Sequence, residues 1–187
     1  FDCWIHAVDP MPMTDGCGGS VWPQLGDALY ERTNKTIGFI NLSSGGSSVV
    51  DWDQDDELKN RIYWGLVHHK PIKAILWHQG ETDVRNRMSG SGYEKHLTNI
   101  INESRKIYHD IVWYVSIVSY IGNDAVSLYR ENILQAQLNV IEKSDNVHRG
   151  PDTDIIRDRY DGIHFNKKGA FLYSRMWANT LYPYDKQ

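Results

Sequence analysis

The stretch "KAILWHQGETD", residues 73 to 83, runs from a short apolar segment directly into a cluster of polar side chains. Its first half has the length and the apolar content of a strand that is buried on both faces of a sheet. Polar groups at the end of such a strand are costly to desolvate unless they bond to one another or to a ligand. The stretch therefore predicts a buried parallel strand whose end carries either a structural hydrogen-bond network or a functional site.

Strand-like and helix-like patterns alternate along the rest of the chain. Short runs of β-branched and aromatic residues predict strands at 36–42, 73–77 and 111–120. Apolar side chains at three- and four-residue intervals predict helices at 21–32, 55–69, 92–109, 124–143 and 167–181. This alternation is typical of an α/β protein with a parallel sheet, whose ligands bind beyond the carboxyl ends of the strands.

Length and composition exclude several other classes of protein. The chain has 187 residues, of which 41% are hydrophobic and 24% charged, as expected of one ordinary globular domain. The formal net charge of -4 comes without a basic tract, so we expect no nucleic-acid partner. No segment approaches the roughly 18 to 20 apolar residues that a membrane span needs, so we expect no membrane partner either.

A glycine-rich loop, "NLSSGGSSVVDW" (41–52), follows the first predicted strand. Gly45 and Gly46 would allow the backbone to approach a ligand closely and to direct amide groups at it. The alternative is a tight turn into a helix that is capped by serines. A phosphate-binding loop fits less well, because the loop has neither the P-loop lysine nor a GxGxxG spacing.

The last polar loop, "RYDGIHFNKKG" (159–169), places Asp161 three residues before His164. Across a turn, this spacing lets the carboxylate accept the Nδ1 proton, which leaves Nε2 available as a general base. The alternative is an ordinary surface turn. Three polar loops follow or precede predicted strands and helices of this one chain, and this coincidence favours a functional site over an ordinary surface turn.

No metal or cofactor site is predicted. The acidic run at 51–57 has the aspartate spacing of a calcium loop, but it lacks the glycine and the final glutamate of an EF-hand. Cys3 and Cys17 have the spacing of neither a redox pair nor a zinc site, and a disulfide between them and two free thiols both remain open.

Taken together, the loops resemble those of the SGNH hydrolases, and within them the carbohydrate esterases typified by sialate O-acetylesterase and acetyl-xylan esterases. The matching blocks occur in the family's order: "AVDPMP" (7–12), "GGSSVVDW" (45–52), "WHQGETD" (77–83) and "DGIHF" (161–165). Of these four blocks, WHQGETD is the most specific to the family. The resemblance implies a three-layer, flavodoxin-like parallel sheet with helices on both faces, whose first strand is absent from this chain.

The resemblance also implies roles for individual residues. His164 would be the general base and later the acid, and Asp161 would orient it. Gly46 would supply a backbone amide to the oxyanion hole, with Gly45 as the less suitable choice, and Gln79 would supply a side-chain amide. The remaining residue of the implied set is Glu81, which would support the loop that carries Gln79.

One part of the family pattern is missing. The family's nucleophile is a serine in a GDS-like or GQSN-like block after the first strand, and this chain contains no such block. Ser20 falls where the family has a helix start, and the other candidates belong to the glycine-rich loop: Ser43, Ser44, Ser47 and Ser48. We therefore expect residues 1–187 to be the C-terminal portion of a single esterase domain. A companion N-terminal segment or chain would then carry the serine and a central strand.

The expected function is that of a serine-type carbohydrate O-acetylesterase, which removes acetyl groups from an O-acetylated sugar through an acyl-enzyme and needs no cofactor. An extracellular, periplasmic or secretory-pathway location would suit such a substrate. Two alternatives remain: a catalytically inactive glycan-binding domain derived from this fold, and a lipid or aryl esterase of the wider SGNH group.

Overall fold

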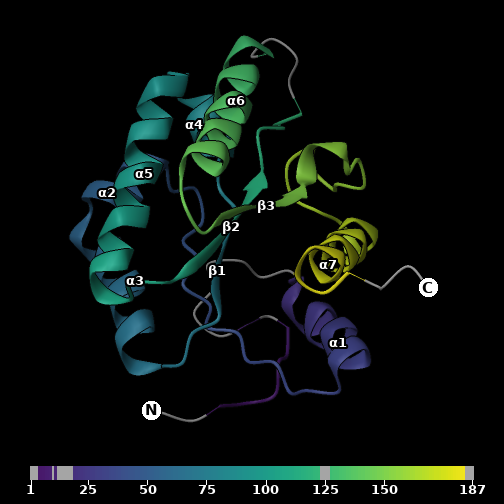
Figure 1. Cartoon of the computed structure of the whole chain (residues 1–187). Coiled ribbons are helices and arrows are strands. Elements are labelled where there is room, and N and C mark those ends of the chain that lie inside the picture. The colour runs from purple at the N-terminus through teal and green to yellow at the C-terminus, as the bar shows by residue number, and fades with distance from the viewer. Residues whose placement is uncertain (1–3, 10, 12–18, 123–126, 184–187) are drawn as a thin grey trace. The chain divides into compact units, whose positions relative to one another are not determined.

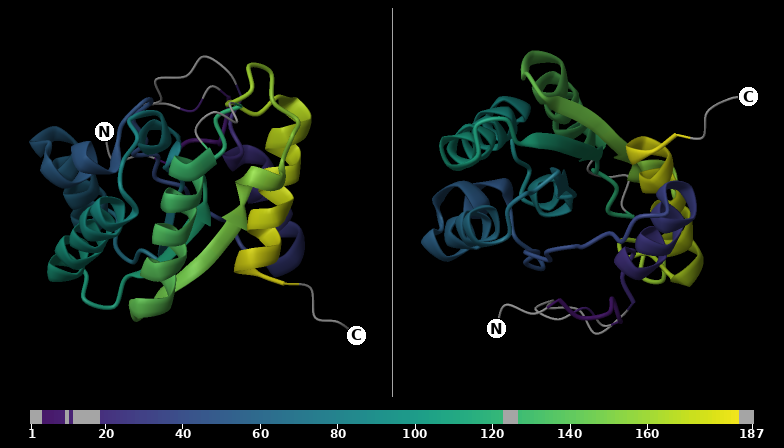
Figure 2. Two further views of the ribbon diagram at one scale, coloured as in Figure 1. Left: turned by 90° about the horizontal axis from the view of Figure 1, so that it is seen from above. Right: turned by 60° about the horizontal axis from the view of Figure 1, so that its bottom comes forward.

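The computed structural model describes residues 4–9, 11, 19–122 and 127–183, so Cys3 and Cys17 lie outside the described residues. The chain forms two compact units: one comprises Gly46–Ile155, and the other comprises Phe1–Gly45 together with Ile156–Gln187. Each unit is described by itself below (Figures 1 and 2).

The unit formed by residues 46–155 contains a parallel sheet of three strands. These are β1 (Ala74–Trp77), β2 (Val112–Ile117) and β3 (Val147–Asp152), and they lie in the order β1-β2-β3. Both neighbouring pairs are parallel, with Leu76 opposite Tyr114 and Tyr114 opposite His148. The carboxyl ends of all three strands therefore meet at one edge of the sheet.

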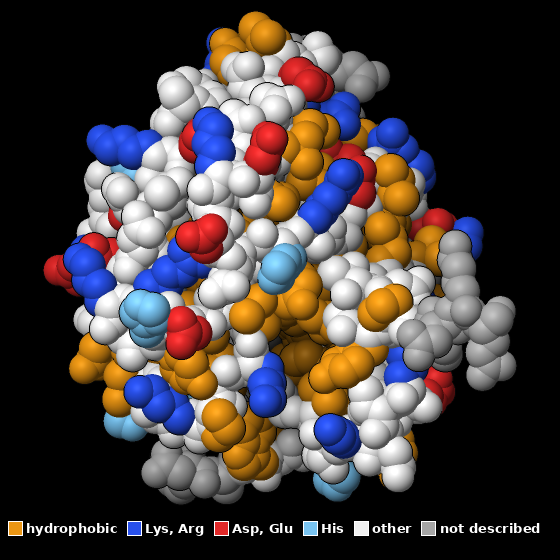
Figure 3. Space-filling view, in the orientation of Figure 1, with side chains coloured by type: hydrophobic (Ala, Val, Ile, Leu, Met, Phe, Trp, Pro, Cys, Tyr) orange, Lys and Arg blue, Asp and Glu red, His pale blue; other side chains and the backbone are white. Residues whose placement is uncertain are grey.

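Helices join and cover these strands. The crossover from β1 to β2 contains α4 (Glu81–Arg85) and α5 (Gly90–Ile107), and the crossover from β2 to β3 contains α6 (Ser127–Lys143). α6 packs on β2, on β3 and on α5, and the ribbon views show α5 and α6 side by side (Figure 1). Lys143 of α6 pairs with Glu94 of α5 at 2.7 Å, and side chains of both charges lie interspersed over these helices (Figure 3).

The core of this unit is rich in aromatic residues. Trp77 of β1 lies 5.7 Å from Trp113 of β2 and 5.7 Å from Trp52 of α2 (Val49–Gln54), measured between ring centroids. Tyr93 and Leu97 of α5 are fully buried against them, and α3 (Asp56–His68) adds Leu58, Ile62 and Leu66. These contacts fix α2, α3 and α5 to the sheet.

The second unit contains two helices, α1 (Trp22–Thr33) and α7 (Lys167–Leu181), which pack against each other. The guanidinium of Arg32 donates to the Tyr182 carbonyl at 2.6 Å and to Asn179 Oδ1 at 2.7 Å, which ties the end of α1 to the end of α7. Trp177 is fully buried on α7. None of the helices in the described ranges is long and apolar enough to cross a membrane.

The structure confirms the predicted α/β fold with a parallel sheet flanked by helices, and all five predicted helices are found within a few residues of their expected bounds. The prediction of a strand at 36–42 is wrong: within the described ranges this segment joins no ladder. A run of apolar residues counts as a strand only where its backbone pairs with a neighbour. β3 was missed because "VHRGPD" has no apolar run, which suits an edge strand.

Gln137 of α6 links the ends of two strands. It is fully buried, it donates to the carbonyls of Gln79 (3.1 Å) and Val118 (3.0 Å), and it accepts from the Val118 amide at 3.0 Å. These backbone groups lie just beyond β1 and β2. One side chain thereby satisfies buried polar groups on both strands.

We expect Gln137→Leu to lower the free energy of unfolding by about 2 kcal/mol or more, because buried backbone groups of Val118 lose their partner. Urea denaturation followed by circular dichroism measures this. The matched control is Gln135→Leu on the exposed side of the same helix, which should change stability little. Equal losses in the two variants would contradict the assigned role of Gln137.

Candidate functional site

The Asp161 carboxylate holds the turn that contains His164. One oxygen, Oδ1, accepts from the backbone amides of Ile163 (2.9 Å) and His164 (2.7 Å). The other, Oδ2, lies 2.6 Å from Nδ1 of His164. The predicted pairing of these two side chains is thus present within one unit, and it assigns the Nδ1 proton to the hydrogen bond with Asp161.

Neighbouring residues keep this turn in place. Gly162 has φ +85°, in the left-handed region that favours glycine. Arg159 lies over the Phe165 ring, with its guanidinium carbon 4.5 Å from the ring centroid, and it donates to the Ile163 carbonyl. Asn166 caps α7 by accepting from two amides, so the turn leads directly into a stable helix.

The electrostatics of the pair suit proton transfer. The hydrogen bond with His164, and then those from the two backbone amides, hold the pKa of Asp161 well below its usual range. The carboxylate therefore stays ionised and can stabilise a positively charged imidazole. The His164 side chain is 65% exposed, and the ring of Tyr160 stacks on it at 5.7 Å with an interplanar angle of 18°. Nε2 is the nitrogen left for a reacting group.

The other unit contains residues 46–52 of the glycine-rich loop and the WHQGETD segment, which are bonded together. Gly46 has φ +72°, so a left-handed conformation is built into the loop. The carbonyl of Gly46 accepts from Thr82 Oγ1 at 3.0 Å, and the next carbonyl, that of Ser47, accepts from Gln79 Nε2 at 3.1 Å. Ser48 then caps α2 in a capping box with Asp51.

Gln79 is 7% exposed, and its amide group is held tightly. Its Nε2 donates to the Ser47 carbonyl and to the Asp83 carboxylate, which uses both amide hydrogens. Its Oε1 is buried without a hydrogen-bond partner among the described residues. Gln79 would therefore have to exchange one of these bonds in order to donate to an oxyanion.

Of the two acids in the segment, it is Asp83 that reaches the glycine-rich loop. Glu81 Oε1 lies 3.2 Å from Nε2 of His78. Asp83 is 1% exposed and accepts from the Val49 amide at 3.1 Å, and burial raises its pKa above the usual value. The resemblance includes Asp83 in the WHQGETD block but implies no role for it.

A second buried acid was missed altogether. Asp154 lies just after β3, and its Oδ1 accepts from the amides of Ser119 and Tyr120 at 2.8 Å each. It thereby holds the loop that follows β2. No signal in the sequence pointed to it, because β3 itself was not predicted.

The predicted residues fall into two groups. Asp161 and His164 lie in one unit, as does Gly45, whereas Gly46, Gln79 and Glu81 lie in the other. Within the ranges that the structure describes, no cluster of three or more His, Cys, Asp or Glu side chains could hold a metal ion.

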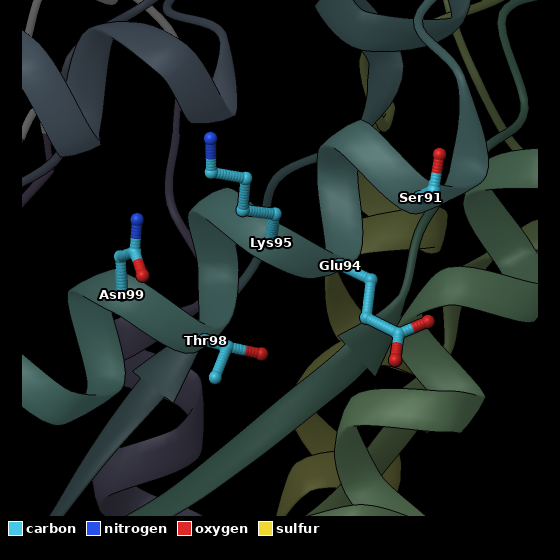
Figure 4. Close-up of a pocket in the computed structure, with 5 residues that line it drawn as sticks. All are labelled: Ser91, Glu94, Lys95, Thr98 and Asn99. Carbon is cyan, nitrogen blue, oxygen red and sulfur yellow. The ribbon is translucent and has the colours of Figure 1, made fainter.

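An open hollow of about 370 Å³ lies on the outer side of α5. Figure 4 shows that its five lining residues all come from this helix, with Lys95 and Asn99 pointing one way and Glu94 another. Glu94 is already bonded to Lys143 and Asn139. The hollow brings no chemically complementary groups together.

Comparison with known sequences identifies a family and a relative. The family model described as carbohydrate esterase, sialic acid-specific acetylesterase, matches residues 2–182. A protein of Arabidopsis thaliana named as a probable carbohydrate esterase is 27% identical over 144 residues, which are 67% of this chain and 54% of that protein. The chain thus spans about half the length of this curated relative.

Two solved structures share the fold. One is a crystal structure of an Arabidopsis thaliana protein, with a TM-score of 0.72 and 21% identity over 88% of this chain and 68% of that one. The other is a carbohydrate esterase family 3 protein of Talaromyces cellulolyticus, with a TM-score of 0.55 and 16% identity over 73% and 67% of the two chains. Since the family model matches nearly every residue, the chain belongs to the sialic acid-specific acetylesterase family of carbohydrate esterases.

Proposed function

We propose that this chain contributes the general base and the oxyanion-binding loops of a serine-type carbohydrate O-acetylesterase. The observation that carries the proposal is the geometry of the Asp161 and His164 pair, with 2.6 Å between Oδ2 and Nδ1. An imidazole with a fixed tautomer and an exposed Nε2 is suited to take a proton from a hydroxyl nucleophile. Membership of a carbohydrate esterase family supports an acetylated sugar as the substrate.

In the proposed reaction, a serine hydroxyl attacks the acetyl carbonyl while His164 Nε2 takes its proton. The imidazolium then gives this proton to the departing sugar oxygen, and an acetyl-enzyme forms. Water, deprotonated by the same nitrogen, releases acetate and restores the serine. The Asp161 carboxylate stabilises the imidazolium in both halves of the reaction.

The oxyanion of each tetrahedral intermediate needs hydrogen-bond donors. In our proposal, the Gly46 amide supplies one and Gln79 supplies a second after exchanging its bond to the Ser47 carbonyl. Gly45 is a less suitable alternative to Gly46. Glu81 supports the loop through His78.

The nucleophilic serine, in this proposal, is supplied by a segment outside these 187 residues. Three serine hydroxyls of the glycine-rich loop form local hydrogen bonds: Ser43 Oγ donates to Asn41 (2.8 Å), Ser48 Oγ donates to Asp51 (2.7 Å), and Ser47 Oγ accepts from Trp52 Nε1 (2.7 Å). In the described sheet β1 is an edge strand, so its outer side can accept a further strand. Both observations support a nucleophile brought by a companion segment.

The intact dyad argues against an inactive glycan-binding domain. A carboxylate that fixes the tautomer of an exposed histidine is suited to proton transfer, which sugar binding alone does not require. Substrate choice separates the remaining esterase alternatives: release of acetate from O-acetylated sugars supports the proposal, whereas activity on aryl or lipid esters alone would refute the carbohydrate assignment.

His164→Ala should reduce acetate release from O-acetylated sugars by at least about 100-fold, because the reaction loses its base. The assay uses the form of the protein that includes the serine-bearing segment. The matched control is His109→Ala, because His109 is also exposed and also lies 2.6 Å from an aspartate, Asp110. Retained activity in His164→Ala would refute the base assignment, and an inactive wild-type protein would refute the esterase itself.

Asp161→Asn should show a pH-dependent loss of stability. Because the folded pKa of Asp161 is lowered, its stabilisation is fully present above about pH 4 and is lost as the pH falls through the lowered pKa. The difference in melting temperature between wild type and variant should therefore shrink from pH 6 toward pH 2. A difference that stays constant over this range, relative to an Asp110→Asn control, would contradict the assigned hydrogen bonds.

A further inference from the structure

We propose that Asp83 is a positioning residue, which joins the glycine-rich loop to the Gln79 loop and sets the orientation of the Gln79 amide. This inference rests on the proposed function, because it gives Asp83 its purpose in the oxyanion-binding half of the site. It concerns one unit only, since every residue involved lies within Gly46–Ile155.

The Asp83 carboxylate contacts both loops at once. Its two oxygens lie 3.3 and 3.1 Å from the amide nitrogen of Val49, the first residue of α2. The nearer oxygen also accepts from Nε2 of Gln79. Val49 follows Gly46 by three positions, so the carboxylate fixes the path of the backbone from Gly46 into the helix.

The same contact decides which way the Gln79 amide faces. Nε2 donates to Asp83 and to the Ser47 carbonyl, both of which are pure acceptors. Turning the amide over would place Oε1 against these two acceptors. The carboxylate therefore keeps the nitrogen of Gln79 on the side of the glycine-rich loop, where Gly46 lies.

Burying the Asp83 carboxylate costs desolvation free energy. Asp83 is 1% exposed, and desolvation is the largest influence on its pKa, which is raised. A neutral replacement would avoid this cost but would weaken the bonds from Val49 and Gln79. Titratable groups with shifted pKa values are frequent at functional sites, which supports a functional role for Asp83 beside the geometry above.

Asp83→Asn tests the proposal because it keeps the shape and removes the second acceptor. The one remaining oxygen is a weaker acceptor than a carboxylate. In one orientation it still faces both donors while the new nitrogen lies against the Val49 amide, and in the other orientation the nitrogen faces both donors. The bonds that hold Gln79 and the start of α2 should therefore loosen, while the fold persists. Should Asp83→Ala also be made, it removes both acceptors and should have a larger effect.

Hydrogen exchange measured by NMR on this chain reports directly on the Gln79 side-chain amide and the Val49 backbone amide. In wild type, the Nε2 hydrogens of Gln79 and the Val49 amide should exchange slowly; in Asp83→Asn both should exchange about tenfold faster or more. The Gln79 signals are assigned by their absence from a Gln79→Leu spectrum. The matched control is Asp53→Asn, which changes another mostly buried acid that is bonded to His96 and Asn99 and lies on α2, the helix that begins at Val49.

The proposal holds if Asp83→Asn speeds exchange at both groups and Asp53→Asn does not. Unchanged exchange in Asp83→Asn, or equal changes in both variants, would overturn it. In the serine-bearing form of the protein, Asp83→Asn should lower kcat about tenfold or more with little change in KM, whereas Asp53→Asn should leave kcat unaltered. An inactive wild-type protein would refute the proposed function, while the exchange result would still decide the role of Asp83.

Discussion

The close approach of two strand ends is the constraint on which the glycine-rich half of the site depends. A side chain at residue 80 would lie 2.0 Å from the Val118 carbonyl, so only glycine fits where β1 and β2 finish. Gln137 fills the remaining space and satisfies the backbone groups of both loops. Because the backbone beyond β1 cannot shift, the side chains of Gln79 and Asp83 are presented in one fixed direction.

The sequence predicted the elements that have long apolar patterns and missed those that depend on pairing or on capping. The strand at 73–77 and the helix at 167–181 are found as expected, because the length and spacing of their apolar residues match a strand and a helix. α2 and α4 have six and five residues, too few for a helical period to be recognised. The segment at 36–42 has the composition of a strand, but pairing depends on a neighbour that composition does not reveal.

In the candidate site too, features set by local sequence were predicted and features set by the fold were not. The turn of Asp161 and His164 is a local structure, so the spacing of the two residues was enough to predict their hydrogen bond. Which acid of WHQGETD reaches the glycine-rich loop is not local: it depends on the direction in which α4 leaves the strand. The resemblance gave a role to Glu81 within its own loop, and the structure adds Asp83, two residues later, against Val49.

The two aspartates have opposite environments, and these match the two proposed roles. Asp161 is solvent-exposed, and hydrogen bonds lower its pKa, so it remains an anion beside an imidazole that gains and loses a proton. Asp83 is buried, and desolvation raises its pKa, so its charge is sustained only by the amides that it holds in place. Pairs of acids whose surroundings move their pKa values apart are a recurrent feature of active sites. In the proposed reaction the first aspartate would serve proton transfer and the second the geometry of the oxyanion-binding loops, so each carboxylate suits its role through a different physical effect.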